Sequence, residues 1–206
     1  MLVRIYEENP NPKAIQQAVD ILKSGGVIIY PTDTVYGIGC DITNQKAIER
    51  VCQIRGLQTQ KANLSFICYD LTDISQYTKP FDTSVFRLLK KALPGPFTFI
   101  FNASGQVPKL LSSKKKTVGI RVPDNSIVRE IVKELGNPIV TTSIHDDDDI
   151  IEYSTDPELI YEKYGEKVDM VIDGGYGDNV ASTVVDLTQG EFEVIREGKG
   201  DLSAYL

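Results

Sequence analysis

The chain has 206 residues, of which 41% are hydrophobic and 25% are charged, and its formal net charge is −7 at pH 7. This composition is that of an ordinary globular protein, and the length is sufficient for a large core without disulfides or a structural metal. Because binding to phosphate backbones relies on excess Lys and Arg, the negative charge argues against generic nucleic-acid binding.

Targeting and linker signals are absent from the sequence. It contains no apolar run of about 18 residues, and residues 1–7 lack the apolar centre of a signal peptide. We therefore expect a cytoplasmic protein with no membrane partner, folded as a single domain over residues 1–206. Cys40, Cys52 and Cys68 lack metal-ligand spacing, so we expect small buried side chains there and predict no metal site.

The first predicted elements are a helix and a strand. Asn11 and Pro12 stand in the order of an N-cap and a first-turn proline, and Gly25 and Gly26 end the helix that they begin. Residues 27–30 follow as four successive apolar positions, which predicts a strand covered on both faces.

A polar loop comes directly after this strand. Pro31 cannot continue a central ladder, and Thr32, Asp33 and Thr34 follow it. Ligands bind beyond the carboxyl ends of strands in open α/β sheets, which favours a polar site here. The competing interpretation is a strand-to-helix loop in which Thr32 and Asp33 bond only their own backbone.

The remaining elements alternate between helices and strands. A second helix runs from Asn44 towards Arg55. Further helices are predicted at 84–92, 127–135 and 157–164, and strands at 64–68, 97–101, 118–122, 139–142, 168–172, 183–187 and 192–196. Strands close the chain, so the pattern predicts an α/β fold with a mixed sheet and antiparallel pairs near the end.

Hydroxyl and guanidinium side chains recur at the predicted strands. They are Thr34, Arg121, Thr141, Ser143, Ser182, Thr183 and Arg196. Such a set suits an anionic ligand, because arginine offers a fixed fork of donors and the hydroxyls add short hydrogen bonds. For Arg121 an internal ion pair is the alternative, since an unpaired buried charge is costly.

Five segments taken together resemble the YrdC/YciO family. They are residues 30–41 (YPTDTVYGIGCD), 94–98 (PGPFT), 119–123 (GIRVP), 182–186 (STVVD) and 195–198 (IREG). The match runs in order from about residue 12 to residue 200, and residues 66–71 and 196–201 look closer to the YciO branch. The resemblance implies a YrdC-like twisted open mixed sheet with flanking helices and a concave face.

The resemblance also implies threonylcarbamoyl-AMP synthase chemistry. In that reaction threonine and bicarbonate give a carbamate that attacks the α-phosphate of ATP and expels pyrophosphate, with Mg²⁺ bound to the phosphates. The product feeds threonylcarbamoyladenosine modification of tRNA. The alternative is a non-catalytic YciO-type protein that binds double-stranded or structured RNA. Residues 114–116, three lysines, could supply a basic patch for RNA or be a solvated loop.

Carried over residue by residue, the resemblance assigns roles to nine positions. Those expected around threonine are Thr34, Arg121, Thr141 and Ser182, with Arg121 on the carboxylate. Those expected to face the nucleotide are Arg55, Lys61, Thr117, Ser143 and Arg196. Arg55 and Arg121 are expected to be catalytic.

Two positions depart from the synthase pattern. Gln53 stands where the synthases have the lysine of Lys-x-Arg, and His145 stands where they have the asparagine of Ser-x-Asn. One cation expected near the triphosphate is therefore missing. Residues 146–149 are four aspartates, which would repel a triphosphate unless a metal intervened, and we interpret them as a solvated turn.

Overall fold

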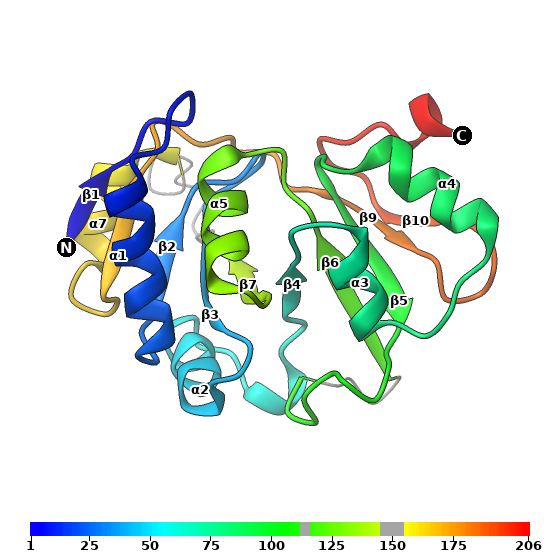
Figure 1. The fold of residues 1–206 in the computed structure, drawn as a ribbon, viewed down its shortest axis with the longest axis horizontal. Helices are drawn as coiled ribbons and strands as arrows, with labels where there is room; N and C mark the ends of the chain where they lie inside the picture. The colour runs from blue at the N-terminus through cyan, green and yellow to red at the C-terminus, as the bar shows by residue number, and fades with distance from the viewer. Residues whose placement is uncertain (112–115, 145–154) are drawn as a thin grey trace.

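A long mixed sheet organises the computed structural model, which describes residues 1–111, 116–144 and 155–206 (Figure 1). Within those ranges the sheet has ten strands in the order β1-β8-β2-β3-β7-β4-β6-β5-β9-β10. The strands are β1 (Leu2–Arg4), β2 (Ile28–Tyr30), β3 (Gly37–Asp41), β4 (Ser65–Ile67), β5 (Phe97–Asn102), β6 (Thr117–Arg121), β7 (Ile139–Ser143), β8 (Met170–Asp173), β9 (Thr183–Asp186) and β10 (Glu193–Arg196).

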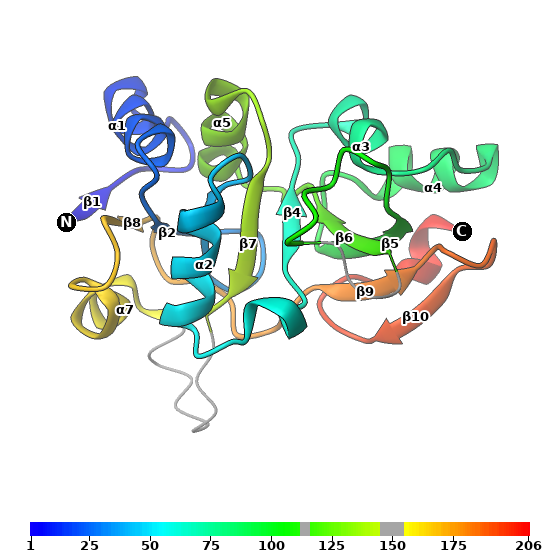
Figure 2. The ribbon, with the colours of Figure 1, turned by 90° about the horizontal axis from the view of Figure 1, so that it is seen from below.

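Helices cover both faces of this sheet. They are α1 (Pro12–Lys23), α2 (Gln45–Ile54), α3 (Leu71–Tyr77), α4 (Thr83–Ala92), α5 (Ser126–Leu135) and α7 (Pro157–Tyr164), with short 3-10 turns η1 (Thr59–Lys61) and η2 (Leu202–Tyr205). Figure 2 shows α1 and α5 together on one side of the sheet, with α2 and α7 on the other. In β2, Ile28 and Tyr30 pack with α1 and α5, while Ile29 between them packs into the opposite core.

Strand pairing confirms the predicted α/β class and mixed sheet. Parallel pairs join β1 to β8, β8 to β2, β4 to β6 and β5 to β9, and the other neighbours are antiparallel. The expected antiparallel pairing near the chain end holds for β9 and β10. It is wrong for β8, which forms parallel pairs with both β1 and β2.

Local signals located most helix starts. The Asn11 side chain accepts a hydrogen bond from the Lys13 N–H at 2.9 Å, and the Asn44 side chain accepts from the Ala47 N–H at 2.9 Å. All three cysteines are buried and free, as expected. None of the helices in the described ranges combines the length and apolar character that a membrane span requires.

The interpretation of residues 31–39 as a strand-to-helix loop is wrong, because the loop leads into β3. Tyr30 pairs with Gly37 across the β2–β3 ladder. A Cβ on Gly37 would lie 3.0 Å from Tyr30 Cε2, and one on Gly39 would lie 2.7 Å from the Tyr30 hydroxyl and 2.4 Å from the Val140 carbonyl oxygen. These glycines therefore belong to a strand over which another side chain passes closely, a situation that favours glycine.

We expect Gly39→Ala to lower the free energy of unfolding by about 1 to 3 kcal/mol, because the new methyl group would be overpacked against the backbone of β7. Gly105→Ala is the control, since a Cβ at Gly105 has no atom within 4 Å. Urea unfolding of both variants measures the difference. Equal midpoints for the two variants would contradict the close packing of β3.

Candidate functional site

A pocket of about 780 Å³ lies beyond the carboxyl ends of several parallel strands. This edge pocket is lined by residues 31–34, 124–125, 174 and 176–179, together with Glu7, Pro96, Thr155 and Lys199. The lining segments follow the mutually parallel strands β1, β8 and β2, beyond whose carboxyl ends ligands bind in open α/β sheets. A further lining segment follows β6, which is parallel to β4. Its charged lining side chains are Glu7, Asp33, Asp124, Asp178 and Lys199, so its charge is predominantly negative.

Arg121 is buried beside the loop that follows β2. Its Nη2 donates to Asp33 Oδ1 at 3.0 Å and to Thr34 Oγ1 at 2.9 Å, and the Arg121 and Asp33 side chains are only 8% and 10% exposed. Burial lowers the pKa of Arg121, and the Asp33 carboxylate opposes that shift. The predicted alternative of an internal ion pair is therefore confirmed, with Asp33 as the partner.

The same guanidinium keeps a further donor. Arg121 Nε is buried and makes no hydrogen bond within the part of the chain that the structure describes. Thr34 accepts from Arg121 and also lines the edge pocket. The guanidinium therefore retains donor capacity beyond its bonds to Asp33 and Thr34.

Thr141 joins this group through Tyr30. The hydroxyl of Tyr30, which is fully buried, donates to Thr141 Oγ1. A Cβ on Gly37 would lie 3.1 Å from the same Thr141 oxygen. The Arg121 charge acts on the Tyr30 hydroxyl and partly opposes the rise that burial causes in the pKa of Tyr30. Thr34, Arg121 and Thr141, three members of the predicted threonine set, therefore lie in one group.

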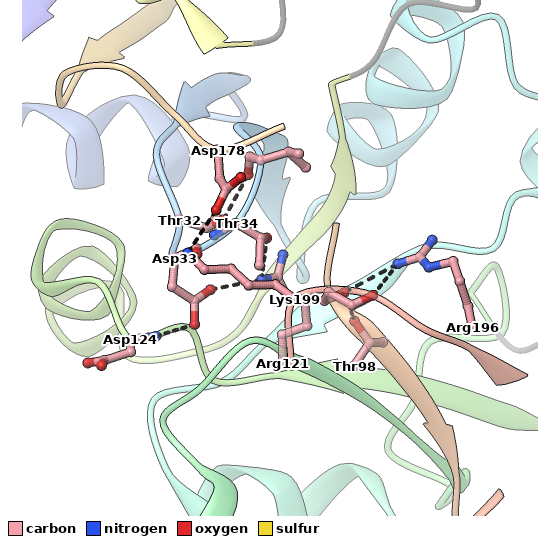
Figure 3. Close-up of polar contacts among 11 residues, drawn as sticks. Thr32, Asp33, Thr34, Thr98, Arg121, Asp124, Asp178, Arg196 and Lys199 are labelled. Atoms are coloured by element: carbon pink, nitrogen blue, oxygen red, sulfur yellow. Dashed lines mark hydrogen bonds and ion pairs between the residues drawn. The ribbon is translucent and has the colours of Figure 1, made fainter. Parts of the chain in front are cut away.

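A second polar group contains Ser182 and Arg196. Ser182 Oγ lies 2.7 Å from Thr98 Oγ1, and Arg196 Nη2 donates to the Ser182 carbonyl oxygen at 2.7 Å. The Arg196 charge contributes to lowering the pKa of Arg121. Figure 3 shows the guanidinium of Arg196 pointing towards Thr98 and Arg121 rather than away from them. The two predicted arginines face a common region.

A register shift in β10 aims Arg196 at this region. Val194 pairs with Val185, but the next pair joins Arg196 to Val184, so Ile195 is skipped. Val184 also pairs with Thr98 and shares its face of the sheet. Regular alternation would place Arg196 on the opposite face, so this bulge redirects the side chain.

Small and polar residues connect the two groups across the sheet. Ser65 pairs with Gly119 on one side and with Thr141 on the other, so their side-chain positions share one face. A Cβ on Gly119 would lie 3.0 Å from Ser65 Oγ and 3.3 Å from Thr98 Cγ2. We call these residues, Thr98, Gly119, Ser65 and Thr141, the polar strip.

The predicted nucleotide residues are more dispersed. Ser143 and Thr117 stand two positions from Thr141 and Gly119 and so share the face of the polar strip. Arg55 follows α2 and donates to the Tyr164 hydroxyl at 3.1 Å. Lys61 ends η1 and is exposed. Residues 114–115 and 145–149, which carry the other predicted charges and His145, lie outside the described residues.

Sequence reasoning missed Lys199 as a member of the site. Its Nζ donates to the Asp33 carbonyl oxygen at 2.7 Å and pairs with Asp178 Oδ2 at 2.9 Å, which lowers the pKa of Asp178. No local sequence pattern links Lys199 to Asp33 or to Asp178, because these residues lie far apart in the chain. Asp33 and Thr98 could have been found, because both stand inside the motifs that carry the family resemblance.

The described part of the chain contains no cluster of three or more His, Cys, Asp or Glu side chains that could hold a metal ion. The edge pocket and the polar strip are also distinct in lining. Of the nine predicted site residues, all within the described ranges, the edge pocket is lined by Thr34 alone. Its acidic side chains make it the less suitable of the two for a polyanion.

Comparison with known proteins places the chain among named relatives. A family model described as Sua5_yciO_yrdC, telomere recombination, matches residues 20–198. The chain is 41% identical over 203 residues to an uncharacterized protein, YciO, of Escherichia coli K12, covering 98% of this chain and 97% of that protein. It is 30% identical over 169 residues to a threonylcarbamoyl-AMP synthase of Vibrio vulnificus YJ016, covering 80% of this chain and 88% of that protein.

Solved structures show the same architecture. The crystal structure of E. coli YciO has a TM-score of 0.91 at 40% identity and covers 100% of this chain and 99% of that one. P. abyssi Sua5, solved in complex with L-threonine, has a TM-score of 0.84 at 24% identity, and the match covers 96% of this chain and 57% of the Sua5 chain. The predicted twisted open α/β sheet is thereby confirmed.

The buried ion pair predicts a large difference between two conservative substitutions. Asp33→Asn leaves the buried Arg121 charge uncompensated, so we expect a loss of about 3 kcal/mol or more in the free energy of unfolding. Asp178→Asn breaks the more exposed pair with Lys199 and should cost less than about 1 kcal/mol. Chemical denaturation compares them, and equal losses would contradict the central place of the Asp33–Arg121 pair.

Proposed function

The chain belongs to the Sua5/YciO/YrdC family, and we propose that it is a threonylcarbamoyl-AMP synthase-like nucleotidyltransferase. It would convert ATP, threonine and bicarbonate into threonylcarbamoyl-AMP and pyrophosphate, for threonylcarbamoyladenosine modification of tRNA. The observation that carries the proposal is the buried Arg121, which donates to Thr34 and keeps an unused Nε donor, on the face of the sheet that also carries Thr141. The relatives named as synthases, at 28% to 30% identity, support it.

The proposed reaction places negative charge on both reactants. Bicarbonate and the threonine amine combine with loss of water to give a carbamate. A carbamate oxygen then attacks the α-phosphorus of ATP, and pyrophosphate leaves with the bonding electron pair. Because two anions must meet in line, positioning and cationic donors provide most of the acceleration. Mg²⁺ is expected to arrive bound to the ATP phosphates, as part of the substrate.

The threonine end of the site is assigned to Arg121 and its neighbours. A guanidinium recognises a carboxylate through paired N–H donors, and burial strengthens that interaction. Thr34 accepts from the guanidinium, and Thr141 accepts from the Tyr30 hydroxyl, on which the Arg121 charge acts. Ser182 stands in the adjoining group beside Arg196. Asp33 holds Arg121 through Nη2, the same nitrogen that donates to Thr34.

The nucleotide end is assigned to the face of the polar strip. Ser143 and Thr117 share that face, and the bulge in β10 brings Arg196 to it. The edge pocket, with its excess of carboxylates, would repel a triphosphate. Arg55 at the end of α2 is the proposed further cation, and its present hydrogen bond to Tyr164 would have to be shared or exchanged.

We expect pyrophosphate release from Mg²⁺ and ATP only when threonine and bicarbonate are both present. Arg121→Ala and Arg55→Ala should each lower the rate by about 10²-fold or more, because each removes a cation aimed at the reacting anions. Arg87→Ala, an exposed change on α4, is the control and should retain the wild-type rate. Arg121→Lys keeps the charge beside Asp33 and tests the fork geometry without stranding that carboxylate.

The same preparation tests the competing RNA-binding hypothesis. Steeply salt-dependent binding to structured RNA, without threonine-dependent pyrophosphate release, would contradict the synthase proposal and favour the RNA-binding protein. Normal rates in both Arg121→Ala and Arg55→Ala would instead remove these residues from the site.

A further inference from the structure

Tyr30 occupies a special place behind the threonine end of the proposed site. We propose that Tyr30 is a positioning residue, which donates to Thr141 and thereby fixes the Thr141 hydroxyl as a donor that selects a carboxylate. The inference rests on the proposed function and deepens it by naming how the site chooses its substrate group. Tyr30 itself would touch no substrate.

The backbone around Tyr30 is built to receive its ring. Tyr30 is fully buried, and its hydroxyl donates to Thr141 Oγ1. The neighbouring strand offers Gly37 and Gly39, where a Cβ would lie 3.0 Å from Tyr30 Cε2 and 2.7 Å from the Tyr30 hydroxyl, respectively. Because both positions are glycine, the Tyr30 ring can lie directly against the backbone of β3 with its hydroxyl at Thr141, and close packing leaves little room for another orientation.

The direction of the hydrogen bond follows from the chemistry of the two hydroxyls. Burial raises the pKa of Tyr30, and the opposing effect of Arg121 is smaller, so the phenol stays protonated and can donate. A threonine hydroxyl has one proton and two lone pairs. Once Thr141 accepts from Tyr30, its proton is available to another acceptor, and among the described residues Thr141 donates to none.

A second donor without a partner lies on the same face of the sheet. Arg121 Nε is buried and makes no hydrogen bond to any described residue, and its guanidinium lies close enough to Tyr30 to lower the phenol pKa. Asp33, the nearby carboxylate, already accepts from Arg121 and from the Asp124 N–H. A group of donors without a free acceptor suits a carboxylate and rejects a neutral amide at the same place.

Tyr36 is a matched control in the same motif. It is also fully buried, but its hydroxyl donates to the Gly175 carbonyl oxygen at 2.7 Å and accepts from the Gly174 N–H at 3.1 Å. Tyr36→Phe therefore removes the same atom from an equally buried ring and affects a backbone loop instead of Thr141. A general loss of stability would appear in both tyrosine variants.

The experiment compares L-threonine with L-threonine amide in the pyrophosphate assay. We expect Tyr30→Phe to raise the KM for threonine about tenfold with kcat nearly unchanged, and to narrow the preference for threonine over its amide. Tyr36→Phe should leave the KM for threonine and the preference for threonine over its amide at their wild-type values. Thr141→Val should match or exceed the Tyr30→Phe effect, and adding Tyr30→Phe to it should cause little further loss, because both act through one hydroxyl.

The outcomes separate this inference from the function on which it rests. A wild-type protein that shows neither threonine-dependent turnover nor a threonine-induced rise in Tm contradicts the synthase proposal and with it the role of Tyr30. An active wild-type protein overturns the positioning role alone if Tyr30→Phe keeps its KM and its carboxylate preference. The same conclusion follows if Tyr30→Phe and Tyr36→Phe change KM equally. Thr141→Val gives an independent reading if Tyr30→Phe does not fold.

Discussion

The ion pair between Arg121 and Asp33 is the constraint on which the site depends. It joins the end of β6 to the loop after β2, and both side chains are almost completely buried. Removing a guanidinium from water is costly unless charged and polar groups replace the solvent, and here Asp33 and Thr34 do so. Because Asp33 also accepts from the Asp124 N–H, the pair fixes the relative position of two loops at the sheet edge.

The charges are divided between two regions of the molecule. Carboxylates line the edge pocket, whereas donors and hydroxyls gather around the polar strip, and Thr34 stands at the boundary between them. Lys199 crosses this boundary by binding the Asp33 carbonyl oxygen and the Asp178 carboxylate. An anion is therefore attracted to one side of the Asp33 loop and repelled from the other.

The sequence allowed the elements with local signals to be predicted. Asn11 and Asn44 do cap helices, and the apolar run before Pro31 is a buried strand. β3 was missed because Gly39 has no side chain that could contribute to a two-residue period. Position 39 must be glycine because the Tyr30 hydroxyl, on another strand, leaves no room for a Cβ. An internal ion pair was predicted for Arg121, but its partner was not. Asp33 lies 88 positions away in the chain, and sequence periodicity carries no information on a contact over that separation. The roles in binding and catalysis stay predictions that rest on the family resemblance.

The irregularity that redirects Arg196 has a second consequence, for solubility. β10 is the last strand of an open sheet, so its outer backbone groups could recruit a strand from another molecule. The skipped residue, Ile195, interrupts the regular spacing of backbone donors and acceptors that pairing with another strand requires. The charged residues at the ends of β10, Glu193 and Arg196, also disfavour such pairing. A single extra residue thus serves both to turn Arg196 towards the polar strip and to discourage self-association along that border.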